Sequence, residues 1–241
     1  MTMKDYSIFH SGDQAITISV GNAISVENHQ KVLSVKKWFD EHPFPGLLDI
    51  VIAYNSVTVV YDAYTASQQF DLKPASRAIR ELAARACQAT AISRADNSSV
   101  VRIPVCYETP HAPDMQEVMA LSGLSEKEII QFHTSVTYLV YMIGFLPGFP
   151  YMGPVPEQIR VPRKDKPAPL VKAGSVGVAG FQTGIYSVDS PGGWRIIGAT
   201  PLRMFDKDAE RPSALEAGER IEFYPISERE FRALGDQLEW V

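Results

Sequence analysis

Side chains suited to holding a small polar ligand gather in four stretches of the second half of the chain. These stretches are HTSVTYLVYMIGFLPGFPYMG (133–153), PRKDKPAPLVKAGSVGVAG (162–180), FQTGIYSVDSPGGW (181–194) and IIGATPLRMFD (196–206). Their glycines and prolines fix the backbone shape and let a ligand approach the main chain closely. The aromatic residues among them predict a rigid apolar wall with exposed amides, which is typical of a pocket for a small, flat, polar molecule.

Polar residues in the same stretches have the chemistry to orient such a molecule. Arg163 and Lys164 lie beside a glycine-rich run and are suited to hold a carboxylate or a phosphate. Ser175 and Gln182 offer neutral hydrogen bonds to an amide. His133 adds an imidazole, the side chain that titrates nearest to neutral pH.

Each of these residues also has a structural interpretation. The aromatic residues are apolar enough to belong to the core, and Arg163 has the character of a solvated surface charge. His133 closes a predicted helix, where it would favour the negative end of the helix dipole. Tyr138 suits packing on a strand. The clustering of these residues within about sixty positions favours the pocket interpretation, because pockets gather a few polar groups among apolar ones.

Common catalytic motifs are missing. The chain has no G-x-x-x-x-G-K-[ST] phosphate loop, and Ser175 stands in A-G-S-V-G rather than in a G-x-S-x-G elbow. The glycines of residues 174–180 precede no predicted helix, so they form no dinucleotide-binding fingerprint. The five histidines (His10, His29, His42, His111 and His133) form no H-x-x-x-H pattern, and no cysteine pair joins them. The sequence therefore predicts no metal site and no self-contained NTPase or serine hydrolase.

Composition and charge limit the kinds of binding partner and the cellular compartment that we expect for this protein. The net charge of −5 on 241 residues makes nucleic acid or a membrane surface a poor partner, and the N-terminus shows no signal-peptide pattern. Residues 129–156 carry no Lys, Arg, Asp or Glu, but the proline-glycine cluster at 144–156 argues against a membrane-spanning helix. Cys87 and Cys106 form no C-x-x-C motif, which indicates structural thiols in a reducing compartment. We therefore expect a cytoplasmic protein.

The first hundred residues alternate between strand and helix patterns. Strands are predicted at 13–20, 47–54, 56–62 and 99–105, and helices at 25–40 and 74–89. This βαββαβ order is ferredoxin-like, although the strand at 99–105 can instead open the second domain. The short polar segment 93–99 is the predicted linker. We expect a small α+β domain at 1–96 and a second domain at 97–241.

The second half begins with helices and continues as short strands. Helices are predicted at 114–123, at 125–133 with a Ser125–Glu128 capping box, and at 227–234. Strand patterns separated by Gly and Pro occur at 136–143, 159–162, 175–180, 184–188, 194–200, 202–206 and 220–226. Many short strands at nearly regular spacing favour an antiparallel barrel or sandwich.

The same motifs resemble the allophanate hydrolase subunit 1 family, also called the KipI family or carboxyltransferase subdomain C/D. The most specific pieces are GFLPGFPYMG (144–153), AGSVGVAGFQTGIYSVDSPGGW (173–194) and GATPLRMFD (198–206), and the resemblance extends over residues 12–226. It implies that the second domain is a cyclophilin-like antiparallel β-barrel, so the expected fold class is α+β.

The resemblance implies a protein that is active only in a complex. The expected role is that of the B subunit in an ATP-dependent 5-oxoprolinase, which converts 5-oxoproline to glutamate. Its sisters would be a C subunit of the KipA, or allophanate hydrolase subunit 2, type and an A subunit of the LamB/YcsF type. The complex would use ATP with Mg, and this chain would hold no tightly bound cofactor. Two alternatives are an inhibitor that binds a sporulation sensor histidine kinase and an allophanate hydrolase or urea carboxylase-type carboxyltransferase subunit.

The motifs that carry the resemblance also supply the expected site residues. Groups expected to position or polarise the substrate, rather than to attack it, are His133, Arg163, Ser175 and Gln182. Residues expected to bind the substrate are Tyr138, Phe145, Gly148, Phe149, Tyr151, Gly174, Tyr186, Gly192, Gly193 and Trp194.

The sequence departs from the family pattern at a few positions. That pattern resembles P-R-x-x-x-P-R-x-x-V-P-A-G-S-V; Arg163 is kept, but Ala168 replaces the second arginine and Lys172 replaces a proline. Ala199 stands where relatives often carry a basic residue. Two cations suited to holding an anion are therefore absent, and Lys172 and Arg203 are the candidates to replace them. A different substrate, or a role based on binding, is the alternative consequence.

Overall fold

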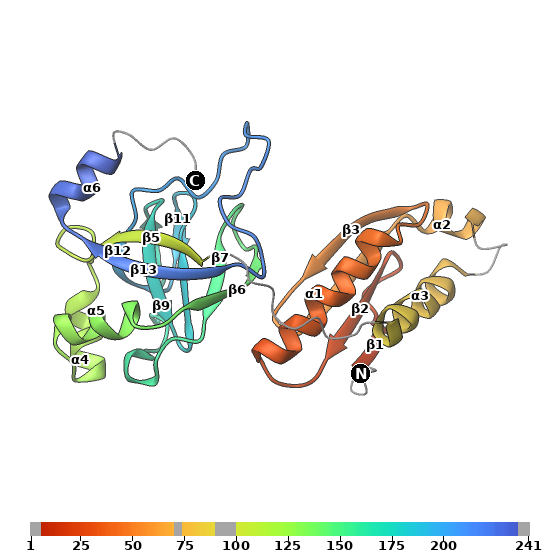
Figure 1. Ribbon diagram of the computed structural model, residues 1–241, viewed down its shortest axis with the longest axis horizontal. Helices are drawn as coiled ribbons and strands as arrows, with labels where there is room; N and C mark the ends of the chain where they lie inside the picture. Colours follow the sequence, from red (N-terminus) through yellow and green to blue (C-terminus); the bar gives the residue numbers. More distant parts are fainter. Residues whose placement is uncertain (1–5, 70–73, 90–99, 236–241) are drawn as a thin grey trace. The chain divides into compact units, whose positions relative to one another are not determined.

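The computed structural model describes residues 6–69, 74–89 and 100–235 (Figure 1). Clustering of contacts divides the chain into two compact units, Met1–Asn97 and Ser98–Val241. The predicted linker at 93–99 lies outside the described residues. Each unit has its own apolar core, as expected of separate domains.

The first unit is a four-stranded antiparallel sheet with helices packed against it. Its strands are β1 (Tyr6–His10), β2 (Ala15–Val20), β3 (Leu47–Ile52) and β4 (Ser56–Tyr61), in the order β1-β2-β4-β3. Its helices are α1 (Val26–Glu41), α2 (Ala63–Gln69) and α3 (Ala75–Ala89). Helix α1 lies against β3 and β4, and α3 lies against β1 and β2 (Figure 1). Every second residue of β4, namely Val57, Val59 and Tyr61, is buried, so that one face of the strand belongs to the core.

The expected ferredoxin-like topology of this unit is not confirmed. The sequence pattern gives no sign of the hairpin strand β1, and the strand expected at 99–105 forms β5 (Val100–Cys106) in the sheet of the second unit. The residues of β5 from Ile103 to Cys106 are all buried. A strand buried on both faces suits the inside of a packed barrel better than the edge of a small sheet.

The second unit is a closed seven-stranded barrel, which confirms the expected barrel. Around the barrel the order is β10-β7-β6-β13-β5-β12-β9. The bounds of these strands, β5 excepted, are β6 (Tyr138–Ile143), β7 (Pro150–Gly153), β9 (Ser175–Ala179), β10 (Gln182–Ile185), β12 (Arg195–Ala199) and β13 (Arg220–Ile226). A small sheet pairs β8 (Ala168–Val171) with β11 (Ser190–Gly192). The expectation of a wholly antiparallel barrel is wrong at one place, because β13 and β5 run parallel.

Helices accompany the barrel at the predicted places. They are α4 (Met115–Ser122), α5 (Glu126–Thr134) and α6 (Glu228–Gly235). The 3-10 turn η1 (Glu157–Ile159) was not predicted. The capping box that opens α5 is confirmed, since the Ser125 hydroxyl accepts from the Glu128 backbone and the Glu128 carboxylate accepts from the Ser125 backbone. None of the described helices combines the length and apolar character needed to cross a bilayer.

Two predicted strands of the second unit are wrong. Residues 159–162 follow η1 without joining a sheet, and residues 202–206 contribute only one isolated bridge, Phe205 to Ser213. Both segments adjoin prolines, Pro162 and Pro201. A proline lacks the backbone N–H that a strand ladder needs, so short apolar runs beside it are poor strands.

The barrel interior contains a polar group, the ring of His133, which is fully buried. Its Nδ1 lies 2.8 Å from the Tyr107 hydroxyl, and its Nε2 lies 2.9 Å from the Thr183 hydroxyl. The Thr183 hydroxyl donates to the Gly177 carbonyl over 3.1 Å, so its oxygen accepts the hydrogen bond from His133 Nε2–H. The Tyr107 hydroxyl then donates to Nδ1, and both ring nitrogens are satisfied in the neutral form. The ring also stacks on Phe223 with centroids 4.6 Å apart.

This enclosure disfavours a charged ring. Burial lowers the pKa of His133 from its ordinary value of 6.5 to about 3. Protonation would also turn Nδ1 into a donor facing a hydroxyl that already donates to it. His133 is therefore a neutral member of the core at neutral pH.

We expect the stability of the protein to depend on pH through His133. Because its pKa is depressed by folding, its contribution is complete above pH 6.5 and is lost progressively as the pH falls toward 3. Over that window the free energy of unfolding should fall by about 1.4 kcal/mol per pH unit from this one residue. Urea unfolding of the wild type and of His133→Gln at a series of pH values measures the difference in slope.

The exposed His10 supplies the matched control. Compared with His10→Gln, His133→Gln should flatten the pH slope and also lower stability at pH 7, because it disturbs buried hydrogen bonds. Equal pH slopes for the wild type and His133→Gln would contradict the assignment of a neutral, buried ring.

Candidate ligand-binding site on the barrel

Two adjoining cavities lie on the barrel unit. Cavity A, of about 550 Å³, is lined by Pro110, His111, Pro113, Asp114, Lys164, Ala168, Leu170, Val171, Lys172, Ala173, Ser175, Ile196, Ala199 and Phe231. Cavity B, of about 520 Å³, is lined by Ala173, Gly174, Ser187, Val188, Asp189, Thr200, Pro201, Leu202, Arg203, Met204, Phe205, Phe231 and Gly235. Both volumes are in the range of small-molecule sites, and Ala173 and Phe231 line both cavities.

The turn at Gly174 separates the two cavities. Gly174 has a φ of +85°, and a Cβ added there would lie 2.5 Å from the Thr200 carbonyl oxygen. Only glycine fits this backbone, for both reasons. The turn is also held by the Asp189 carboxylate, which accepts from the Ala173 backbone N–H at 2.8 Å. Ser175, the next residue, is thereby fixed in the wall of cavity A.

The lysines that border cavity A are each paired with a carboxylate. Lys164 Nζ lies 2.6 Å from Asp114 Oδ1, and Lys172 Nζ lies 2.8 Å from Asp189 Oδ2. The sequence predicts Asp114 as the start of helix α4, but its side chain caps nothing; its Oδ2 accepts from the Ile196 backbone N–H at 2.7 Å. Asp114 therefore ties the start of α4 to β12 and fixes the position of Lys164.

The three positions at which the sequence departs from the family pattern come together in cavity A. Ala168, Lys172 and Ala199 all line it. The two alanines leave apolar wall where a larger cationic side chain would enter the cavity. Lys172 supplies one cation at the rim of cavity A. Arg203 instead lines cavity B and pairs with Asp206 at 2.9 Å.

A buried aromatic cluster adjoins cavity A. It consists of Phe149, Tyr186 and Trp194, with Phe149 edge-to-face against Tyr186 at 5.2 Å and against Trp194 at 5.4 Å. The cluster packs on Val171 and Ile196, which also line cavity A. Thus one wall joins the predicted aromatic residues to the cavity.

The edge of this cluster carries an exposed cation and two further aromatic residues. The guanidinium carbon of Arg163 lies 5.8 Å from the Trp194 ring centre, and within the described part of the chain Arg163 forms no hydrogen bond or ion pair. Burial raises the pKa of Tyr151, and the nearby charge of Arg163 opposes that shift. Phe145 is 70% exposed, with its ring 6.1 Å from that of Phe149.

The predicted glycines have steric roles. Gly148 has a φ of +74°, and a Cβ there would lie 2.8 Å from the Met204 carbonyl oxygen. A Cβ on Gly192 would lie 2.3 Å from the Tyr186 hydroxyl. The carbonyl of Gly193 accepts from the Lys164 backbone N–H at 2.8 Å.

The predicted site residues thus fall into three places. Ser175 and Gly174 line the cavities, and the aromatic residues with Arg163 form the adjoining cluster. His133 and Tyr138 lie inside the barrel, where the Tyr138 hydroxyl donates to the His133 carbonyl at 2.8 Å. Outside these places, Gln182 is half-buried at the start of β10 and, like Gly148, Gly192 and Gly193, lines neither cavity.

Sequence reasoning missed several residues that line cavity A. His111 and Asp114 reach it from the segment between β5 and α4, and Phe231 reaches it from α6, more than a hundred residues later. No local spacing signals their meeting, because it depends on the closure of the barrel. The only sequence signal at Asp114 is that of a helix start, which describes its backbone and not its carboxylate.

Comparison with known proteins agrees with this architecture. The family described as "Carboxyltransferase domain, subdomain C and D" matches residues 6–215. The chain is 37% identical to the 5-oxoprolinase B subunit of Bacillus subtilis over 98% of this chain and 99% of that protein. It is 47% identical to the 5-oxoprolinase B subunit of Escherichia coli O157:H7 over 54% of this chain and 60% of that protein.

A solved structure gives the same result. A conserved uncharacterized protein from Pyrococcus horikoshii is 39% identical, and the match covers 93% of this chain and 100% of that one with a TM-score of 0.53. The family match spans both units and includes the turn at Gly174, the aromatic cluster and the three departures in cavity A. The chain therefore belongs to the carboxyltransferase domain family, subdomains C and D.

Proposed function

We propose that this chain is the B subunit of an ATP-dependent 5-oxoprolinase and acts with sister subunits of the A and C types. The observation that carries the proposal is the similarity to the 5-oxoprolinase B subunit of Bacillus subtilis, which extends over nearly the full length of both chains. The substrate would be 5-oxoproline, which the complex opens to glutamate.

The chemistry of the barrel surface supports a role in binding and orientation. 5-Oxoproline is a small flat lactam that carries a carboxylate. Arg163 presents unpaired donors beside the aromatic cluster, which suits a carboxylate. The Ser175 hydroxyl in the wall of cavity A suits a lactam amide. Holding the substrate in one orientation is itself a large part of catalysis.

Residues inside the barrel have a supporting part in this proposal. His133 and Tyr138 are enclosed, and the ring of His133 already has a partner at each nitrogen. We therefore do not propose that either residue touches the substrate. They stiffen the barrel on which the ligand-binding residues stand.

The chain does not fit the role of the ATP-binding member of the complex. The sequence has no phosphate loop, and the two lysines that line cavity A, Lys164 and Lys172, are both paired with carboxylates. We assign ATP and Mg to the complex as a whole.

Reconstitution tests the proposal directly. The chain is mixed with A-type and C-type subunits, ATP, Mg and 5-oxoproline, and the glutamate formed is measured. We expect glutamate that disappears when this chain is omitted. A complex that assembles without forming glutamate would overturn the 5-oxoprolinase assignment and would favour another amide substrate or a regulatory role on a sensor kinase.

Replacement of Arg163 tests its role as the carboxylate-binding group. In the reconstituted complex, Arg163→Ala should raise KM for 5-oxoproline by about 10- to 100-fold, because a charge-assisted hydrogen bond contributes roughly 1.5–3 kcal/mol. Arg160→Ala is the matched control, since Arg160 is also exposed and its guanidinium donates to the Val155 carbonyl and to no other group in the described ranges. A KM unchanged in Arg163→Ala, or raised equally in both variants, would contradict this role.

Phe145 tests whether the exposed aromatic edge is functional. It has a φ of +66°, a conformation that disfavours a side chain. Phe145→Gly should therefore keep or raise stability, by up to about 1 kcal/mol, while activity of the complex falls. Phe9→Ala, which removes a half-exposed aromatic residue of the first unit, should not change activity. Full activity in Phe145→Gly would show that the aromatic edge is dispensable.

A further inference from the structure

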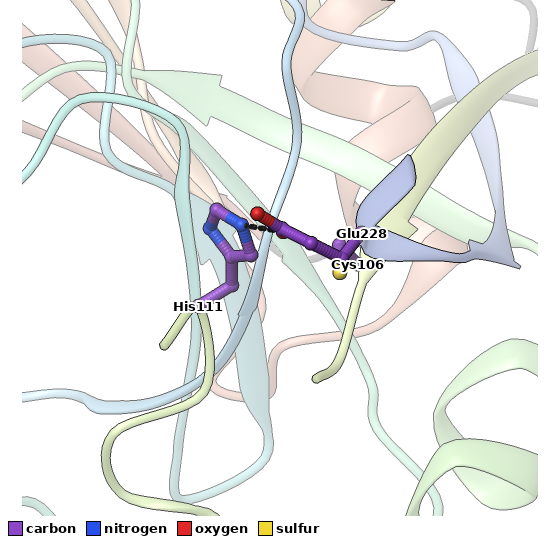
Figure 2. Close-up of side chains that lie close together, drawn as sticks. All are labelled: Cys106, His111 and Glu228. Atoms are coloured by element: carbon purple, nitrogen blue, oxygen red, sulfur yellow. Dashed lines mark hydrogen bonds and ion pairs between the residues drawn. The ribbon is translucent and has the colours of Figure 1, made fainter. Parts of the chain in front are cut away.

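Three side chains with metal-binding chemistry meet at one end of the barrel. Cys106 Sγ, a ring nitrogen of His111 and a carboxylate oxygen of Glu228 all lie within 4.8 Å of one another. Figure 2 shows the imidazole and the carboxylate facing each other, with the sulfur beside them. This cluster is distinct from the residues to which a ligand role was given above.

The parallel pair in the barrel explains why these residues meet. Strands β5 and β13 run side by side in register from Val100 and Arg220 to Cys106 and Ile226, so both end at the same edge. Glu228 begins α6 two residues after β13 ends. His111 follows β5 after a short turn in which its backbone N–H bonds the Glu108 carbonyl at 2.8 Å. His111 and Glu228, which are more than a hundred residues apart in the sequence, are thus brought into contact.

The donor set is the one that zinc prefers. A thiolate, an imidazole and a carboxylate are the usual ligands of Zn²⁺ in proteins. In a tetrahedral site with ordinary bond lengths the donor atoms lie roughly 3.3–3.6 Å apart. His111 Nε2 and Glu228 Oε2, which now bond each other directly, would have to separate to admit the ion between them, and rotation of the Glu228 side chain at the start of α6 can provide this. Two anionic donors would also balance the charge of a divalent ion.

Each donor is held by a second contact, as is usual around metal sites. The other Glu228 oxygen, Oε1, accepts from Arg232 Nε at 2.6 Å, which leaves Oε2 directed at His111 Nε2. The backbone of Glu108 forms a hydrogen bond with the thiol group of Cys106. The ring of His111 packs against that of Phe231, with centroids 4.0 Å apart.

We propose that Cys106 Sγ, His111 Nε2 and Glu228 Oε2 bind a transition metal ion of the Zn²⁺ class. His111 and Phe231 line cavity A, so the ion would border that cavity and its fourth coordination position would be available to water or to a ligand there. The competing explanation is that His111 and Glu228 form an ion pair that anchors α6 without a metal. The sequence alone predicts no metal site, because neither the spacing of Cys106 and His111 nor the distance to Glu228 matches a known motif.

Cobalt substitution of the free chain tests the proposal without the sister subunits. The protein is treated with a chelator, freed of it, and titrated with Co²⁺ as a spectroscopic probe for zinc. We expect one equivalent of Co²⁺ to produce a thiolate-to-cobalt charge-transfer band and the intense visible bands of a four-coordinate ion, with Zn²⁺ displacing it. No such bands, together with no Zn²⁺ binding by calorimetry, would overturn the proposal.

Substitution of each proposed metal ligand tests which side chains bind the ion. Cys106→Ser should abolish the charge-transfer band, while Cys87→Ser, which changes the buried cysteine of the first unit, should keep it. His111→Ala and Glu228→Gln, at partly exposed positions, should each lower Zn²⁺ affinity by about 100-fold or more, and Arg232→Gln by about 10- to 100-fold. Binding that survives in His111→Ala, or a band lost equally in Cys87→Ser, would refute the assignment.

The readout separates this inference from the proposed function. Metal binding by the free chain is measured by absorption and calorimetry, whereas the 5-oxoprolinase role is measured by glutamate formation in the complex. Failure of either experiment leaves the interpretation of the other unchanged.

Discussion

The parallel pairing of β5 with β13 is the constraint on which the barrel unit depends. All the other pairs in the barrel are antiparallel between the described strands, and this one joins the first strand of the unit to the last. Parallel neighbours cannot be joined by a tight turn, and here residues 107–219 connect the two strands. Helices α4 and α5 and the aromatic cluster are built within that one long connection, as is most of the wall of both cavities, to which α6 adds Phe231.

Because the first and last strands of the unit pair to close the barrel, their pairing also determines which residues come into contact. Cys106 pairs with both Ile226 and Ala199, because β5 lies between β13 and β12. The carboxyl end of β5 therefore adjoins both cavity A and the start of α6. The inside of the barrel is a different environment: it encloses His133 with partners at both nitrogens, and protonation of the ring is disfavoured there. His133, which the sequence offers as a substrate-positioning group, is enclosed in the fold with both ring nitrogens hydrogen-bonded.

Much of the architecture follows from local patterns. The strand pattern at 13–20, the capping box at Ser125 and the frequent glycines and prolines of the second half predicted elements that the structure contains. The ferredoxin-like order failed because β5 looks the same whether it completes a small sheet or opens a barrel. The difference lies in its partner, β13, which is more than a hundred residues away. Local periodicity carries no information about that choice.

The candidate site was predictable to the extent that its residues lie in one continuous motif. Gly174, Ser175 and Trp194 could be selected because glycine, serine and aromatic residues concentrate there. Asp114 and His111 could not, because their importance comes from contacts across the barrel. The position of His133 inside the barrel was equally hidden, since the end of a short helix gives no indication of which way its last side chains point.

The turn at Gly174 has a consequence for how such sequences are compared. A Cβ there collides with the Thr200 carbonyl, and at Gly148 and Gly192 it collides with other parts of the same surface. The glycines of the motif are therefore required by the shape of the main chain, whereas Ala168, Lys172 and Ala199 determine what cavity A can hold. Different residues therefore set the backbone shape and the chemistry of the cavity. A related protein can keep the glycines while it changes the side chains that line the cavity. A strong match to the motif then measures common ancestry of the scaffold, and the three positions in cavity A are where we expect a change of ligand to appear.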